Sequence, residues 1–134
     1  MARLSSRVCT ALSLAVLLLT TACSPSPTAP IETTVTLTPG ESARISTLTI
    51  QFIGVTIDTR CPANAFCIQA GDAYVALEAS AKGTSRAFEL QLLNPVNRQA
   101  DVRGFTIAVE ELSPYPFGDP IPPGAYRVRL RVSR

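Results

Sequence analysis

The amino-acid sequence predicts an all-β protein, folded as a single antiparallel β-sandwich of the immunoglobulin-like kind with about six or seven strands. Three observations support this prediction. Apolar and polar residues alternate with a period of two through much of residues 35–134, turns containing Gly or Pro interrupt the runs, and no stretch carries a helical apolar stripe. Such alternation gives each sheet one wet face, so two sheets must pack together. A small β-barrel is the alternative.

The first expected strand starts at residue 35 and ends at the turn Pro39-Gly40. The longest alternating run covers residues 48–57, and its phase changes beside Gly54. One face carries Leu48, Ile50 and Phe52, and the other carries Ile53, Val55 and Ile57. A phase change beside a Gly is typical of a β-bulge. We therefore expect this strand to bend from one sheet toward the other.

The second half of the chain continues the β pattern. Residues 73–92 form an expected hairpin, residues 94–104 a polar loop, and residues 105–109 a strand. A Pro-rich irregular segment, residues 113–124, precedes the last strand, residues 126–132. That strand carries a stripe of arginines at Arg127, Arg129 and Arg131. We expect the stripe to be a solvated face that pairs with neighbouring Glu and discourages edge-to-edge aggregation; contact with anionic lipid or envelope polymers is the alternative.

The N-terminus has the parts of a secretory signal peptide at residues 1–22. Its end, Ala22-Cys23, resembles a bacterial lipobox, although Thr20 stands where Leu is usual. Arg3 and Arg7 precede an apolar run at residues 8–19, which is too short to span a bilayer. Small residues then lead to Cys23, the expected lipidation site. An ordinary secretory signal and a retained anchor are the alternatives. We expect an exported protein held in a bacterial membrane by lipid on Cys23, and Ser24 favours the outer membrane over the inner.

Residues 23–34 are rich in Pro, Ser and Thr and are expected to form a flexible tether, before a sandwich domain at residues 35–134. Removing Arg3 and Arg7 from the twelve basic residues leaves ten, which equals the number of acidic residues. The mature chain therefore has a formal net charge of zero. No acidic partner is implied, and nucleic acid is not expected as a partner.

Two cysteines, Cys61 and Cys67, remain in the mature domain. An oxidising compartment favours a disulfide between them, which would stabilise the domain by about 2 kcal/mol through loop closure. A redox site would prefer Cys-x-x-Cys. Structural zinc needs four Cys or His ligands, and the chain has no His. We therefore expect a structural disulfide, with no metal and no cofactor.

The sequence around this pair resembles a motif of small exported bacterial proteins, many of them lipoproteins, that commonly carry D-x-R-C-P, then C-[VI]-W-A-G. The matching positions here are Asp58, Arg60, Cys61, Pro62, Cys67, Ala70 and Gly71. This chain has Gln69 where the others often have Trp. The resemblance extends loosely to the Pro-rich segment and the final strand. It implies export and a sandwich-like fold, and no particular activity.

Five residues are candidates for binding loops: Asp58, Arg60, Asp72, Tyr115 and Phe117. Asp58, Arg60 and Asp72 could together form a polar or weak cation site, but an exposed Asp58–Arg60 pair that braces the loop, worth about 0–1 kcal/mol, is the simpler expectation. Asp72 is expected in a turn. Tyr115 and Phe117 lie in the Pro-rich segment and could serve recognition, or could cover the open end of the sandwich.

Catalysis is not expected, and no catalytic residue is assigned. Without His, a Ser-His-Asp or Cys-His arrangement cannot form. No Gly-rich phosphate loop is present, and the carboxylates Glu78 and Glu89 are expected to face water. We expect a non-catalytic domain that binds another envelope protein or an envelope polymer. A secreted protease inhibitor and a carrier of a small ligand or cation are the alternatives.

Overall fold

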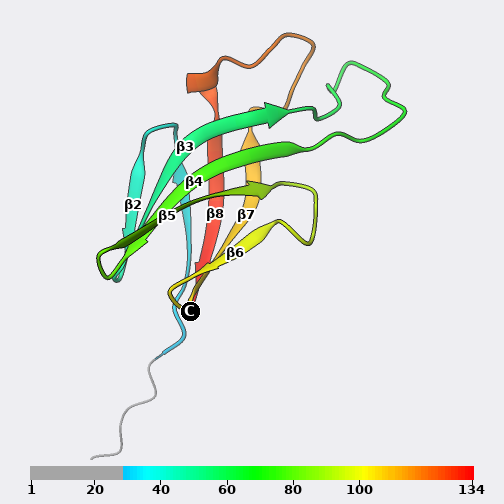
Figure 1. The fold of residues 1–134 in the computed structure, drawn as a ribbon. Coiled ribbons are helices and arrows are strands. Elements are labelled where there is room, and N and C mark those ends of the chain that lie inside the picture. Colours follow the sequence, from blue (N-terminus) through cyan, green and yellow to red (C-terminus); the bar gives the residue numbers. More distant parts are fainter. Residues whose placement is uncertain (1–28) are drawn as a thin grey trace, which may run out of the picture.

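The computed structural model describes residues 29–134, which form two antiparallel four-stranded sheets packed as a β-sandwich (Figure 1). The first sheet has the order β1-β8-β7-β6, with β1 (Glu32–Leu37), β8 (Arg127–Ser133), β7 (Phe105–Ser113) and β6 (Gln99–Val102). The second has the order β2-β3-β4-β5, with β2 (Ser42–Ile45), β3 (Leu48–Asp58), β4 (Ala73–Ala81) and β5 (Thr84–Gln91). The predicted fold class is confirmed.

A single short 3-10 turn, η1 (Pro123–Ala125), precedes β8 in the described part of the chain. Within residues 29–134, no helix has the length and apolar character that crossing a membrane requires. The expected signal peptide (residues 1–22) and the lipidation site Cys23 lie outside the described residues.

The core is aliphatic, with two fully buried aromatic rings, Phe52 from the second sheet and Phe105 from the first. Alternate residues of β4 are buried along its whole length, and the same period appears in β8. These burial patterns are those that the sequence alternation predicts, because successive side chains of a strand point to opposite faces. Phe88 of β5 is only partly buried against the core.

Four strand assignments differ from expectation, among them β7, which continues to Ser113 instead of ending at residue 109. Strand β6 lies within the expected polar loop, where Arg103 and Gly104 adopt positive φ angles of 52° and 84° and turn the chain back into β7. Strand β2 is four residues long, which is too short to show a clear alternation. Strand β1 begins at Glu32, inside the expected tether, because it pairs with the end of β8 at Ser133.

The bulge in β3 is confirmed, but the expected bend between sheets is wrong. The register shifts between Phe52 and Gly54, and again between Val55 and Ile57, while β3 stays paired with β4 as far as Asp58. Gly54 has a φ of 156°, so it absorbs the extra residue without breaking the ladder. The strand therefore remains in one sheet, and the side chain of Ile57 is left 49% exposed.

The arginine stripe does not protect a sheet edge, because β8 lies between β1 and β7. The expected pairing with Glu is confirmed for two of its members. Arg129 contacts Glu110 at 3.4 Å and Glu111 at 2.9 Å. Arg131 contacts Glu110 at 3.3 Å and Glu32 at 3.6 Å, so these two arginines are neutralised within their own sheet.

Candidate functional site

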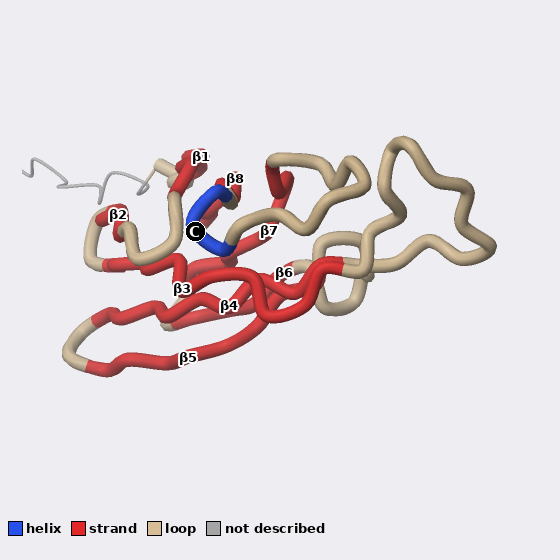
Figure 2. The backbone as a smooth tube through the Cα atoms, turned by 90° about the horizontal axis from the view of Figure 1, so that it is seen from above, coloured by secondary structure: helices blue, strands red, loops and turns tan. Residues whose placement is uncertain are grey.

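The long connections of the described domain gather at one end of the sandwich. They are residues 59–72, 92–98 and 114–126, and Figures 1 and 2 show them beyond the same ends of the two sheets. The opposite end holds short hairpin turns and the entry of the chain, where Ile31 and Arg134 exchange backbone hydrogen bonds. We call the first end the loop end. It contains every candidate binding residue named from the sequence.

The connection 59–72 is a loop that is closed at two places, by a disulfide and by hydrogen bonds at its base. The disulfide Cys61–Cys67 is formed, with a Cα–Cα distance of 5.9 Å, as the sequence predicts. Below it, the N–H of Thr59 donates to the carbonyl of Asp72 at 2.8 Å, and the amide of Asp72 donates to the Thr59 hydroxyl at 3.1 Å. These bonds fasten the neck of the loop where it leaves β3 and enters β4.

Gly71 is required at this neck because the two backbone arms touch there. A Cβ added at Gly71 would lie 1.6 Å from the carbonyl oxygen of Thr59. Real Cβ atoms do not approach so closely, so any other residue would push the arms apart. The Gly of the sequence motif therefore has a packing role in this chain.

Asp58 and Arg60 form a buried clamp between the sheets rather than the exposed brace that we expected. Arg60 Nε and Nη2 donate to the two carboxylate oxygens of Asp58 at 2.8 and 2.6 Å. Nη1 donates to the carbonyl oxygen of Leu112 in the first sheet (2.8 Å), and Nη2 also donates to that of Pro114, just beyond the end of β7 (3.1 Å). Arg60 is 5% exposed. These partners could not be predicted from the sequence, because they lie about fifty residues away from Arg60 along the chain.

Tyr126 completes the clamp. Its hydroxyl donates to Asp58 Oδ2 at 3.0 Å. Desolvation tends to raise the pKa of Asp58, but the hydrogen bonds and charge of Arg60 and the bond from Tyr126 outweigh it, so this pKa is lowered. Desolvation and the neighbouring Asp58 carboxylate raise the pKa of Tyr126. The clamp thus holds Asp58 ionised and Tyr126 neutral, which suits a structural role.

Asp72 does not join this cluster. Its carboxylate accepts the backbone N–H groups of Ala73 at 2.7 Å and Leu93 at 2.8 Å. It therefore ties the loop neck to the 92–98 connection, in agreement with the expected turn role. The structure brings Asp58 and Arg60 together and leaves Asp72 apart from them.

Tyr115 and Phe117 are exposed at the loop end, with 58% and 68% of their surface accessible. The Tyr115 ring stacks on the Arg60 guanidinium, whose carbon lies 5.4 Å from the ring centre. Between the two aromatics, Pro116 is buried and its carbonyl accepts the N–H of Ala63 at 2.9 Å. The Pro-rich connection and the disulfide loop are therefore joined.

Two exposed apolar residues were missed from the sequence. Phe66 and Ile68, on either side of Cys67, are 100% and 99% exposed. A strand pattern cannot flag them, because they lie outside any strand. The available signal was two large apolar residues beside a short disulfide ring, which is too small to bury them.

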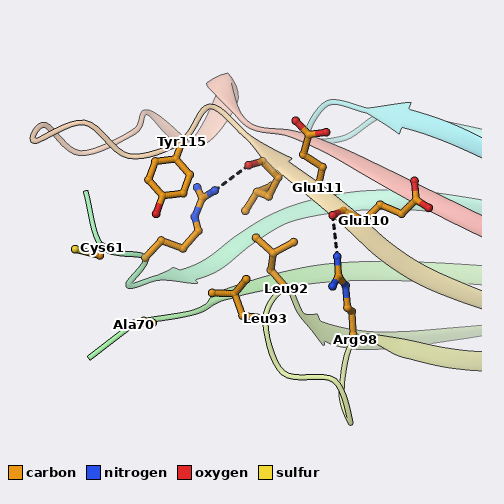
Figure 3. Close-up of a pocket in the computed structure, with 11 residues that line it drawn as sticks. Cys61, Ala70, Leu92, Leu93, Arg98, Glu110, Glu111 and Tyr115 are labelled. Carbon is orange, nitrogen blue, oxygen red and sulfur yellow. Dashed lines mark hydrogen bonds between the residues drawn. The ribbon is translucent and has the colours of Figure 1, made fainter. Parts of the chain in front are cut away.

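A cavity of about 260 Å³ opens beside the clamp, between the neck of the disulfide loop, the 92–98 connection and the end of β7 (Figure 3). Its apolar wall includes Leu92, Leu93 and the Tyr115 ring. Arg98 stands at its rim and donates to the carbonyls of Val109 (2.8 Å) and Glu110 (2.9 Å). The cavity can take an apolar group.

The chemistry available at the loop end is that of a binding surface. Among residues 29–134, no three His, Cys, Asp or Glu side chains lie close enough to hold a metal ion together. The buried charges of Asp58 and Arg60 already satisfy each other. What the loop end offers is exposed apolar side chains on connections that are bonded to one another.

No family model matches the chain, and no match was found among curated proteins or among solved structures.

Proposed function

We propose that this chain is a lipid-anchored protein of the bacterial envelope, and that its non-catalytic β-sandwich binds a partner protein through the loop end. The observation that carries the proposal is the full exposure of Phe66 and Ile68 on a closed loop. Tyr115 and Phe117 add to the same apolar end. Clustered apolar groups that are exposed in this way are typical of interaction sites.

The preorganised shape of the loop end supports a binding role. The disulfide, the Thr59–Asp72 neck and the Ala63–Pro116 bond each limit the freedom of the connections. A binding surface that is ordered before contact loses less entropy on association.

The placement of the loop end also agrees with a lipid anchor on Cys23. The chain enters the domain at the opposite end, near Ile31 and Arg134. An anchor before Ile31 would therefore leave Phe66 and Ile68 at the end of the domain that lies farther from the point of attachment. Between Cys61 and Asp72 the loop carries no charged residue, whereas contact with anionic headgroups is favoured by Lys and Arg. A protein surface is the partner that this end fits better.

Site-specific photocrosslinking tests the proposal. A photoreactive amino acid replaces Phe66 in the full chain, and the matched control carries it at Lys82, an exposed turn residue at the opposite end. We expect a discrete adduct in native envelopes from position 66 only, and its loss when Ile68→Asp is added. Equal adducts from both positions, or none from position 66, would contradict a binding role for the loop end.

A second candidate function, inhibition of a secreted protease, is favoured by one observation. Phe66 stands fully exposed beside a disulfide-bonded cysteine on a projecting loop, and a protease with an apolar specificity pocket could accept it. Titration against chymotrypsin-like and subtilisin-like proteases tests this candidate. Inhibition that Phe66→Ala abolishes would support it, while rapid cleavage at Phe66 or the absence of inhibition would exclude it for these enzymes.

A further inference from the structure

Strand β3 is longer than the neighbour that covers its outer edge. Strand β2 pairs only with Leu48–Gln51, and Gly40 and Glu41 add two backbone bonds at Phe52. From Gly54 to Asp58, the ladder seen in the described chain runs to β4 alone. An antiparallel strand directs its N–H and C=O groups to both sides. The side of β3 that β2 leaves uncovered is therefore an open sheet edge (Figure 1).

A groove of about 410 Å³ lies along this open edge. Val55 and Thr56 of β3 form one wall, and the Pro-rich connection forms the other with Pro116, Pro120 and Ile121. Proline walls are stiff, because their backbone φ is fixed. In the same stretch of β3, Ile53 and Ile57 are 51% and 49% exposed. Open backbone groups and exposed apolar side chains thus occur together.

The charge of this groove that is not balanced by an ion pair is negative. At its base, the carboxylate of Asp58 accepts bonds from Arg60 and Tyr126, so it has no need of another cation. Asp119 is exposed at the groove and, within residues 29–134, forms no ion pair. A ligand that enters here meets one uncompensated carboxylate.

We infer that an extended segment of a partner protein adds as a strand to β3 at residues 54–58 and places a basic side chain beside Asp119. This inference rests on the proposed binding function and names the chemistry of the partner. Strand addition draws affinity from main-chain hydrogen bonds and specificity from alternate side chains. Apolar residues of the segment would pack beside Ile57 and Val55, as cross-strand neighbours do.

Charge and position argue against two other ligands for this edge, a second copy of the chain and the chain's own N-terminal segment. A second copy of the chain, paired through the same edge, would bring two Asp119 carboxylates into one interface. The N-terminal segment of this chain enters the domain at the opposite end, at Ile31. A partner segment with a Lys or Arg meets neither difficulty.

Selection from a random twelve-residue peptide library on the full chain tests the inference. We expect enriched peptides to alternate apolar residues and to carry Lys or Arg. Ile57→Lys should abolish their binding, and Asp119→Asn should weaken it about threefold, as the loss of an exposed ion pair does. The matched control Glu78→Gln, a carboxylate on β4 that forms no ion pair with the described part of the chain, should leave affinity unchanged. Hydrogen exchange should show new protection at residues 54–58.

The outcomes separate this inference from the proposed function. Peptides that bind without new protection at residues 54–58, and that depend on Phe66 or Ile68 instead, would overturn strand addition and leave the loop end as the binding surface. If Asp119→Asn does not alter binding, the inference that the partner places a basic side chain beside Asp119 is wrong. If no peptide depends on Ile57, strand addition is wrong, and photocrosslinking from position 66 then decides whether the loop end binds at all.

Discussion

The guanidinium of Arg60 contacts both carboxylate oxygens of Asp58, two residues before it in the chain, and reaches across to the carbonyl of Leu112 in the other sheet. This relationship joins the start of the disulfide loop to both layers of the sandwich. The loop end is therefore built on a buried ionic clamp, and its stability and its shape depend on the same two side chains.

Replacing Arg60 with Ala should strongly destabilise the domain. Removing one partner of a buried ion pair leaves the other charge without compensation, at a cost of about 3–5 kcal/mol. Urea denaturation measures the loss. The control Arg127→Ala removes an exposed guanidinium and should change the free energy of unfolding by less than about 0.5 kcal/mol. Similar small losses in both variants would show that the clamp contributes little.

Stability should fall at both extremes of pH through the same clamp. The lowered pKa of Asp58 contributes stability that is present above about 3.9, its usual unfolded value, and is lost as the pH falls through the folded pKa. The raised pKa of Tyr126 contributes stability that is present below about 10 and is lost as the pH rises toward the folded pKa.

Denaturation midpoints, measured at a series of pH values from acid to alkaline, give these two losses of stability. Asp58→Asn should make stability less dependent on pH on the acid side, and Tyr126→Phe should make it less dependent on pH on the alkaline side. A dependence on the acid side that is unchanged in Asp58→Asn would assign the pH dependence to other carboxylates.

Local patterns predicted the sandwich because strand alternation is a property of near neighbours in sequence. The burial of Leu77 and Val128 follows directly from it. Strand β6 was missed because four residues carry too little alternation, and because its pairing with β7 depends on a tight Arg103-Gly104 turn. The bend expected of β3 failed because a bulge can shift the register within one sheet as well as lead out of it.

The candidate site was predicted in its residues but not in its arrangement. Asp58, Arg60 and Tyr115 belong to one cluster, yet Arg60 finds Leu112 and Pro114 more than fifty positions away, and no local pattern encodes such contacts. Phe66 and Ile68 were missed for the opposite reason. Apolar residues are expected to be buried, so only their place beside a short disulfide ring could have signalled their full exposure.

Substituting Gly71 with Ala should destabilise the domain by at least about 2 kcal/mol, because the new Cβ would overlap the Thr59 carbonyl and force the loop neck open. The matched control is Gly124→Ala. A Cβ there meets no atom within 4 Å, so little change is expected. Thermal denaturation compares the two variants. Equal melting temperatures of the two variants would mean that the loop neck can open without loss of stability.

Removing the disulfide should loosen the loop and leave the sandwich folded. Cys61→Ser with Cys67→Ser should lower the free energy of unfolding by about 2 kcal/mol, the loop-closure value for so short a ring. Hydrogen exchange should increase within residues 61–70 and stay unchanged in β4. Loss of protection throughout β4 would show instead that the disulfide is needed for the sandwich itself.

The lipid anchor makes a prediction that mass spectrometry can check directly. The protein extracted from membranes should begin at Cys23, carry acyl chains, and gain the mass of two hydrogens when Cys61 and Cys67 are reduced. Cys23→Ser should move the protein to the soluble fraction, because the apolar acyl chains would no longer hold it in the bilayer. A soluble chain without acyl mass would make this a free secreted domain and would favour the protease-inhibitor candidate. A chain that keeps residues 1–22 would refute both the lipidated and the secreted form, since each requires the signal to be removed, and would leave the retained anchor as the remaining alternative.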